Sequence, residues 1–191
     1  MLHKSQKTKN FLTIIGFSII FILLVKYLLT SRREMALDSF LSLASLTLFY
    51  FYYKKLSQDN ISYFFFLFSL VLHCFGLYGA SFLGIMFDHY MHFIAGFALA
   101  IFADRLFFEK MSNRKRVILL LLFSLGIGAI GEIIEWMGYG ILGSGEGFLY
   151  YGIGDEGEWN NSIKDLIFNS FGAVFYCILR FIFNKLKPRN S

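Results

Sequence analysis

The chain has 191 residues, of which 57% are hydrophobic, 20% aromatic and only 16% charged. A soluble domain carries about 25% charged residues, so this composition excludes an ordinary soluble protein and indicates that lipid is the main solvent. The net charge of +5 would suggest nucleic acid in a soluble chain, but Lys and Arg lie here in short loops between apolar runs. Membrane topology explains that pattern, and no nucleic-acid partner is expected.

Six apolar runs are long enough to be membrane-spanning helices, since about 20 apolar residues cross the hydrocarbon core. They cover residues 11–29, 35–53, 61–80, 87–108, 117–142 and 164–183. The sequence therefore predicts an all-α fold, a polytopic transmembrane bundle of six helices that forms one integral membrane domain over residues 1–191. The first run is long, has no small-residue cleavage site and is followed at once by another run, which favours a helix over a signal peptide.

The distribution of Lys and Arg predicts the orientation in the cell membrane. With the N-terminus inside, the inner segments hold twelve basic residues and the outer segments only Arg32, Arg33 and Lys164. Short loops rich in Lys and Arg stay in the cytoplasm, so both termini are predicted to be cytoplasmic. The last outer loop, Gly143–Ile163, is rich in glycine, acidic and aromatic residues. It is either a lid over a site or a solvated connector with interfacial anchors.

Seven polar side chains lie in or at the edge of the last three apolar runs, where a helix in lipid should carry none. They are Asp88, His89, His92, Glu132, Glu135, Asp165 and Asn169. An ionisable group inside a bilayer costs at least a few kcal/mol, so such residues usually face a bundle interior or a wet cavity. Within each run the spacing is i, i+3 or i, i+4, which places the side chains on one helix face.

The depths of these residues predict that they meet. At about 1.5 Å per residue, His92 lies roughly 6 Å below the outer end of its helix and Glu132 about 22 Å above the inner end of the next. Asn169 lies about 6–8 Å below the outer end of the last helix. All therefore fall in one outer layer, in a polar pocket that opens outward. Gly96, Gly126, Gly128, Gly131 and Gly172 predict close helix packing around it.

Two kinds of chemistry fit these side chains. Imidazole and carboxylate groups bind divalent metals, with His89, His92 and Glu132 as the candidate ligands. Without a metal, carboxylates packed this closely cannot all stay ionised, so an acid and a base would lie side by side, as acid–base catalysis or a proton relay requires. The candidate catalytic residues are His92, Glu132, Glu135 and Asp165, and the candidate substrate-binding residues are Asp88, Asn169 and Trp136.

Structural roles are the alternative for several of these residues. Asp88 and Asp165 could cap the N-termini of their helices. Trp136 could be an interfacial anchor, and Asn169 an interhelical hydrogen bond. His73 is expected to be a hydrogen-bonded packing residue and Asp38 to join the site or be solvated. Asp104, Arg105 and Glu109 are expected to pair locally.

Three blocks of sequence resemble a known family. Asp88-His-Tyr-Met-His92-Phe-Ile-Ala-Gly96-Phe, Gly131-Glu132-Ile-Ile-Glu135-Trp136 and Lys164-Asp165 with Gly172-Ala173 are similar to the YjdF-type family of predicted inner-membrane proteins, and more distantly to VanZ-like proteins. The resemblance covers the C-terminal half of the chain. VanZ-like proteins are associated with tolerance of glycopeptide antibiotics, which implies a role at the cell envelope.

These observations leave three functions open. The first is a cell-envelope enzyme or binding protein that acts on a lipid head group or lipid-linked precursor, with a divalent metal as one alternative for the cofactor. The second is a small proton-coupled transporter. The apolar stretch Val117–Phe123 disfavours this function, because it offers no polar path to the inner side. The third is a structural membrane protein, in which the cluster only holds the helices together.

Overall fold

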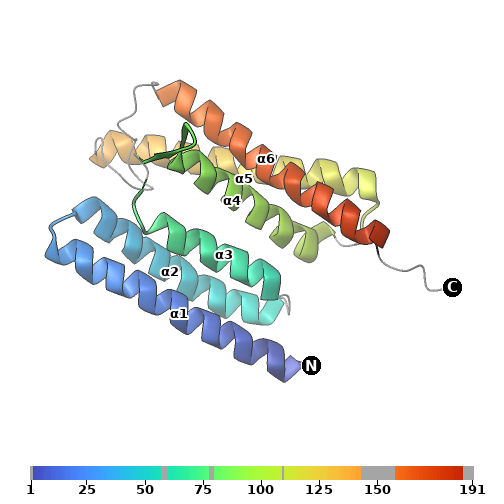
Figure 1. The fold of residues 1–191 in the computed structure, drawn as a ribbon, viewed down its shortest axis with the longest axis horizontal. Helices are drawn as coiled ribbons and strands as arrows, with labels where there is room; N and C mark the ends of the chain where they lie inside the picture. Colours follow the sequence, from blue (N-terminus) through green and yellow to red (C-terminus); the bar gives the residue numbers. More distant parts are fainter. Residues whose placement is uncertain (1, 57–59, 78–79, 109, 143–157, 187–191) are drawn as a thin grey trace.

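A computed structural model describes residues 2–56, 60–77, 80–108, 110–142 and 158–186 of the chain (Figure 1). Almost all of these residues are helical. The elements in chain order are α1 (Leu2–Leu29), α2 (Arg33–Leu56), α3 (Asn60–His73), β1 (Ser81–Phe82), β2 (Ile85–Met86), α4 (Phe87–Ala103), the π-helix η1 (Asp104–Phe108), α5 (Asn113–Leu142) and α6 (Glu158–Leu186).

Four helices are long and apolar enough to cross a membrane. They are Lys7–Leu29, Phe87–Phe108, Asn113–Ile141 and Asn160–Lys185. At about 1.5 Å per residue, each exceeds the ~30 Å of a hydrocarbon core. These helices support the expected membrane protein, but the count of six spans stays a prediction. Charged residues lie near both ends of α2, and the 14 residues of α3 reach only about 21 Å.

The third predicted span, residues 61–80, is wrong in its second half. The helix ends at His73, and Gly76 takes a left-handed conformation with φ of 62°. A side chain at Gly76 would overlap the side chain of Met35, so the turn needs glycine for space as well. The chain then forms a small antiparallel hairpin in which Ser81 pairs with Met86, closed by a turn at Leu83 and Gly84 with positive φ at both positions. Among the residues that the structure describes, the fold is therefore all-α apart from this hairpin.

The last three helices differ from the predicted spans mainly at their ends. The fourth run becomes α4 followed by one π-helical stretch that begins at Asp104. The sixth helix begins at Glu158, six residues before the predicted start at Lys164. Asp165 therefore lies about two turns inside α6 and cannot be its N-cap. Asp88 lies in the first turn of α4, where Met86 is the N-cap residue and no side chain caps the helix.

The helices form two groups of three, α1–α3 and α4–α6, which lie side by side with their long axes in roughly one direction (Figure 1). The core of the first group is built from buried aliphatic and aromatic residues such as Ile20, Tyr27 and Leu46. The core of the second is made of smaller side chains, including Ala100 and Ala173. Small residues allow membrane helices to approach closely, and α4 and α6 are accordingly in intimate contact.

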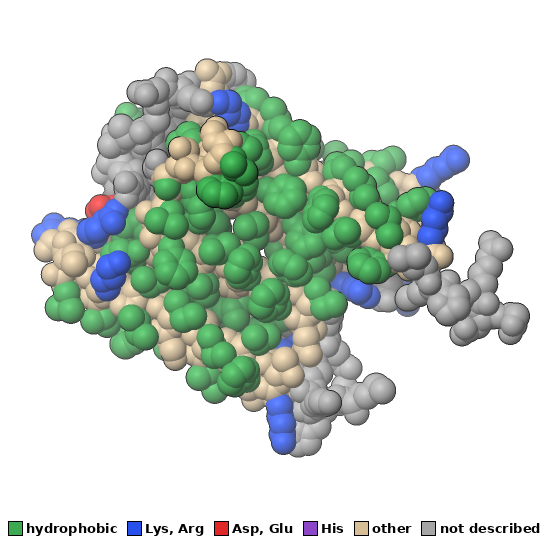
Figure 2. All heavy atoms as spheres, in the orientation of Figure 1, with side chains coloured by type: hydrophobic (Ala, Val, Ile, Leu, Met, Phe, Trp, Pro, Cys, Tyr) green, Lys and Arg blue, Asp and Glu red, His purple; other side chains and the backbone are tan. Residues whose placement is uncertain are grey.

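Ring contacts join the two groups. The rings of Phe65 on α3 and Phe97 on α4 meet edge to face with their centroids 4.8 Å apart. Phe49 on α2 contacts Phe102 on α4 with a centroid separation of 5.7 Å. The outer surface is equally apolar: hydrophobic side chains cover the middle of the face in Figure 2, and Lys and Arg lie toward its margins. Leu29 is 80% exposed and Ile141 81%. Such a surface is suited to lipid rather than water.

Candidate functional site

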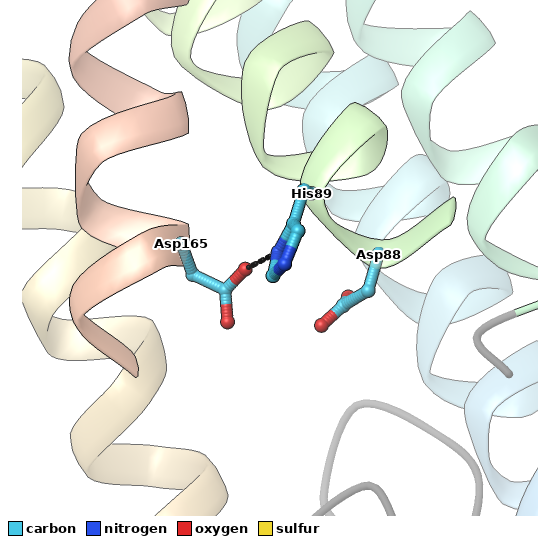
Figure 3. Close-up of side chains that lie close together, drawn as sticks. All are labelled: Asp88, His89 and Asp165. Atoms are coloured by element: carbon cyan, nitrogen blue, oxygen red, sulfur yellow. Dashed lines mark hydrogen bonds and ion pairs between the residues drawn. The ribbon is translucent and has the colours of Figure 1, made fainter. Parts of the chain in front are cut away.

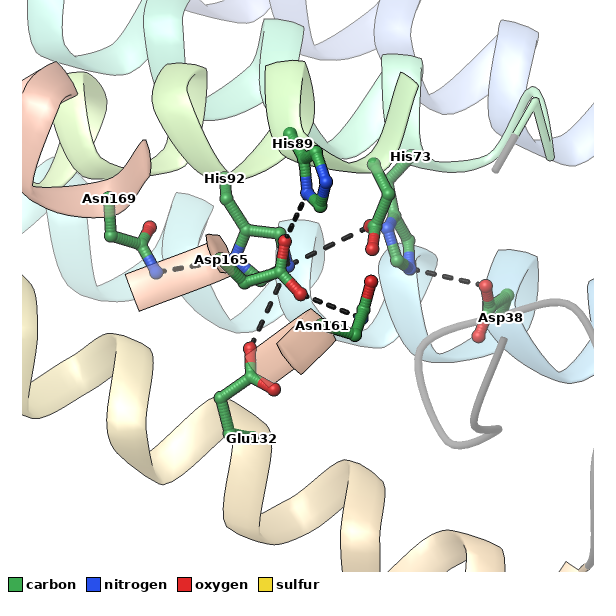
Figure 4. Close-up of polar contacts among 9 residues, drawn as sticks. Asp38, His73, His89, His92, Glu132, Asn161, Asp165 and Asn169 are labelled. Carbon is green, nitrogen blue, oxygen red and sulfur yellow. Dashed lines mark hydrogen bonds and ion pairs between the residues drawn. The ribbon is translucent and has the colours of Figure 1, made fainter. Parts of the chain in front are cut away.

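Helices α4, α5 and α6 bring most of the predicted polar residues together at one end of the bundle. Asp88, His89 and His92 come from the start of α4, and Glu132 from the second half of α5 (Figure 4). Asp165 and Asn169 come from the first half of α6. In Figure 1 the start of α4, the end of α5 and the start of α6 lie at the same end of the molecule. The structure therefore brings these residues together, as expected from the sequence, and their depth in a membrane stays a prediction.

Asp165 lies at the centre of the cluster and is fully buried. The Nδ1–H group of His89 donates a hydrogen bond of 2.8 Å to Asp165 Oδ1, and Asn161 donates one of 2.8 Å to Oδ2. Because an ionised carboxylate only accepts hydrogen bonds, the first contact places the His89 proton on Nδ1. The His89 ring also stacks on Phe168 with a centroid distance of 5.1 Å. Both carboxylate oxygens of Asp165 are thus fixed in direction.

His92 lies one turn after His89 and is held from both of its ring nitrogens. Asn169 Nδ2 is 3.2 Å from His92 Nδ1, which therefore accepts the amide hydrogen. His92 Nε2 faces three carboxylates, with Asp88 Oδ1 and Asp165 Oδ1 each at 3.7 Å and Glu132 Oε1 at 3.9 Å (Figure 4). One imidazole nitrogen is therefore the meeting point of side chains from all three helices.

Glu132 carries the most unusual atom of the site. Its side chain is buried, and Ser162 hydrogen-bonds to its carboxylate. Within the described part of the chain, however, Oε1 has no hydrogen-bond partner and is shielded from solvent. A buried carboxylate oxygen without a partner costs several kcal/mol unless a proton or a cation lies against it. This oxygen points toward His92 Nε2, at 3.9 Å.

The structure places the remaining predicted residues differently. Glu135 is partly buried and lies within the electrostatic reach of Glu132, Asp88 and Asp165. Trp136 is 62% exposed on the outside of α5, so the structure does not bring this predicted substrate-binding residue into the cluster. The predicted lid, Gly143–Ile163, falls largely outside the described residues; its last six residues belong to α6.

Two contacts of the region were not predicted from the sequence. Asn161, which orients Asp165, lies four residues before it on α6. The polar composition of residues 158–162 predicts a loop, whereas these residues form the start of α6. Asp38 on α2 is 1% exposed and lies 3.2 Å from Nε2 of His73 at the end of α3. Asp38 and His73 each lie in an apolar run, and this position is the only sequence signal that links them.

A second polar cluster lies at the opposite end of the same three helices. Asp104 Oδ2 accepts hydrogen bonds from Arg180 Nε at 2.8 Å and from the Tyr176 hydroxyl at 2.6 Å. Arg116 Nε is 3.4 Å from Asp104 Oδ1. Asp104 therefore joins α5 and α6, and the expected local pairing with Arg105 and Glu109 stays a prediction. Glu109 lies outside the described residues.

The main cluster contains two groups of side chains with the donor atoms of a metal site. Asp88, His89 and Asp165 form the first group (Figure 3), and His92, Glu132 and Asp165 the second. In each group the three donor atoms lie within 4.8 Å of one another. Imidazole nitrogen with carboxylate oxygen is a donor set typical of zinc, manganese and iron. The sequence assigned His89, His92 and Glu132 to a metal, whereas the geometry adds Asp88 and Asp165.

Comparison with known proteins gives one match. A family model described as a predicted membrane protein, DUF2238, matches residues 11–185. No curated protein and no solved structure matches the chain. The match supports a membrane protein but names no activity.

Proposed function

We propose that the chain, which belongs to the DUF2238 family of predicted membrane proteins, binds a divalent metal ion between α4, α5 and α6 and presents it to a lipid head group. The observation that carries this proposal is the buried Oε1 of Glu132, which has no hydrogen-bond partner among the described residues and points at His92 Nε2. A cation at this point would satisfy the oxygen and offset the negative charge of the neighbouring carboxylates.

The distances suit such an ion. Ligands bound to zinc at about 2.0–2.2 Å lie roughly 3.3–3.6 Å apart in a tetrahedral site. His92 Nε2 is 3.7 Å from Asp165 Oδ1 and 3.9 Å from Glu132 Oε1, so shifts of a few tenths of an ångström would close the site. His92, Glu132 and Asp165 are the proposed ligands. A fourth position remains for water or substrate, as in catalytic metal sites.

The surrounding residues have supporting roles in this proposal. The amide of Asn169 hydrogen-bonds to Nδ1 of His92, and the amide of Asn161 donates a hydrogen bond to Oδ2 of Asp165. Such contacts orient metal ligands and raise their affinity. Glu135, one turn from Glu132, is the proposed acid or base for chemistry on a bound substrate. The side chain of Asp88 is 22% exposed and that of His92 17%, so the ion would be accessible from the Asp88 side.

The place of the site in the membrane supports a lipid substrate. We infer six spans, a cell-membrane location and cytoplasmic termini from the excess of Lys and Arg in the inner segments. The cluster then lies in the outer layer of the bilayer, next to the head groups. A lipid-linked precursor at the cell envelope is the corresponding substrate class in this proposal.

The interior of the bundle favours this function over proton-coupled transport. Below the site, the core between the two polar clusters is formed by Ala100, Ala103, Leu120 and Ala173, which are at most 1% exposed. A transporter needs a polar path or a change of access through this layer. A purely structural cluster would leave Glu132 Oε1 unpaired at 3.9 Å from His92 Nε2, a cost that a cation between the two atoms would remove.

Metal analysis of the detergent-purified protein tests the proposal. The wild-type protein is expected to hold a stoichiometric divalent ion after loading with zinc or manganese and removal of the excess. His92→Ala and Glu132→Gln are each expected to lose it. His73→Ala is the matched control, because it removes a histidine that belongs to neither donor group. An ion that stays in both site variants, or no ion in the folded wild-type protein, would overturn the proposal.

A further inference from the structure

We infer that the site holds two divalent ions rather than one, that the carboxylate of Asp165 is shared between them, and that the pair takes a phosphate group as its ligand. This inference rests on the proposed function and extends it. The two donor groups of the cluster have Asp165 in common and otherwise use different side chains. Asp88 and His89 would complete the first ion's set, and His92 and Glu132 the second's.

The position of Asp165 fits a bridging role. His89 Nδ1 and His92 Nε2 lie 2.8 Å and 3.7 Å from the same oxygen, Oδ1. The two histidines are one turn apart on α4, so they reach this oxygen from neighbouring positions on one helix face. Asn161 binds the other oxygen at 2.8 Å and fixes the plane of the carboxylate. Figure 4 shows Asp165 between the histidines of α4 and Glu132 of α5.

The charge of the cluster also fits two ions. Asp88, Glu132 and Asp165 each place a carboxylate oxygen 3.7–3.9 Å from His92 Nε2 and carry three negative charges when ionised. One divalent cation balances two of these charges, so a second cation is needed to balance the third. In a site shielded from water by three helices, an uncompensated excess of charge is costly. The hydrogen of His89 that now lies against Asp165 would be displaced by the first ion.

The ligand class follows from the chemistry of paired ions. Two cations about 3.5–4 Å apart can each bind one oxygen of the same phosphate group, and such pairs are used by enzymes that act on phosphate esters. Hard cations with carboxylate ligands prefer anionic oxygen, which a phosphate supplies in excess. At the outer layer of the membrane the source would be the phosphate of a lipid head group, although free inorganic phosphate has the same chemistry.

Manganese loading followed by electron paramagnetic resonance tests the two-ion centre on the full-length wild-type protein. We expect two Mn²⁺ per chain with the spectrum of a spin-coupled pair. One ion per chain would overturn the second ion and leave the proposed function standing, whereas no ion would overturn both. Two uncoupled ions would overturn the shared carboxylate.

Variants assign the two positions. Asp88→Asn is expected to reduce the content from two ions to one, and Asp165→Asn to abolish the coupling. His73→Ala is expected to keep two coupled ions. A variant is compared only if it elutes as a folded monodisperse species, and the wild-type stoichiometry decides the matter if a variant does not fold. Two coupled ions in both Asp88→Asn and Asp165→Asn would contradict the assignment.

The ligand class is tested on the loaded wild-type protein with inorganic phosphate and with short-chain phosphatidic acid. We expect both to change the spectrum of the pair, with phosphatidic acid effective at a concentration at least tenfold lower. Equal effective concentrations would overturn the lipid as the source and leave phosphate as the ligand. A spectrum unchanged by either compound would overturn the ligand class.

Discussion

Gly96 on α4 lies directly against the backbone of Asn169 on α6, so that a Cβ atom at Gly96 would overlap the Asn169 carbonyl group. Gly172 has the same relation to the carbonyl of Phe93 on α4. These two glycines let the helices pack backbone to backbone, and the same contact brings His92 within 3.2 Å of the Asn169 amide. The packing of small residues and the geometry of the polar cluster are therefore parts of one arrangement.

Gly96→Ala is expected to lower the free energy of unfolding by about 1–3 kcal/mol, because the new methyl group meets backbone that cannot rotate away. It is also expected to weaken metal binding by moving Asn169 away from His92. Gly126→Ala is the matched control, since nothing lies within 4 Å of a Cβ atom there. Thermal unfolding in detergent measures both variants. Equal stability of the two would contradict the close approach of α4 and α6.

The sequence predicted the helices that are long and apolar, and it predicted that most polar residues of the last three helices lie together. Both follow from length, hydropathy and helical rise, which are local properties of a chain. It did not predict the end of α3, because the apolar run continues past His73 and the glycines at 76 and 79 were included in the helix. The hairpin with its turn at Leu83 and Gly84 lies between the third and fourth predicted spans, where apolar length predicts no element.

The rotation of each helix about its axis is the information that the sequence lacked. Trp136 follows Glu135 directly, yet it lies on the outside of α5 and is 62% exposed, whereas Glu135 is partly buried. Asp104, at the start of the π-helix, contacts Arg116 and Arg180, which are distant in sequence and were not expected as its partners. Such orientations depend on packing between helices, which apolar composition alone does not specify.

Asp104→Ala is expected to destabilise the protein by about 3–5 kcal/mol, because it leaves the guanidinium groups of Arg116 and Arg180 without their shared carboxylate in a largely buried position. Tyr176→Phe removes only one hydrogen bond to the same carboxylate and should cost about 1 kcal/mol. Chemical or thermal unfolding in detergent gives both values. Because the proposed metal site lies at the other end of the bundle, the folded fraction of either variant is expected to bind metal as the wild type does. A similar cost for both substitutions would contradict the role of Asp104 as the shared partner.

Asn169 is predicted to position His92 for metal binding. When Nε2 of His92 binds an ion, Nδ1 carries the proton, and the Asn169 amide can turn over so that its oxygen accepts this hydrogen. Asn169→Ala removes the partner and is expected to weaken metal affinity by about 10–100-fold. Asn169→Asp still offers an acceptor and is expected to bind the metal about 10–100-fold more tightly than Asn169→Ala. Competition with a metal-sensitive dye measures the affinities, and indistinguishable values for the two variants would rule out this positioning role.

Trp136 is predicted to face lipid rather than substrate. The chain has two tryptophans, so Trp159→Phe leaves Trp136 as the only one. In vesicles, brominated lipids are expected to quench the fluorescence of this variant, most strongly with bromine at shallow acyl positions, because an exposed indole near a helix end lies at the membrane interface. Trp136→Ala should keep the full metal content. If brominated lipids do not quench the fluorescence and Trp136→Ala loses its metal, Trp136 belongs to the site and does not face lipid.

The number of spans can be decided at a single position, the end of α2. In Figure 1, α1 begins and α2 ends on the same side of the bundle as the end of α6. If all six helices cross the membrane, a reporter fused after Leu56 lies in the cytoplasm. If only the four long apolar helices cross, α1 alone precedes this point and the reporter lies outside, whereas α4, α5 and α6 keep the same orientation in both cases.

We expect the cytoplasmic result, because Lys54 and Lys55 at this end favour the inner side. A fluorescent-protein fusion should then be bright and an alkaline phosphatase fusion inactive, both after Leu56 and after Leu186. An active phosphatase after Leu56, with an inactive one after Leu186, would mean that α2 and α3 lie against the bundle without crossing.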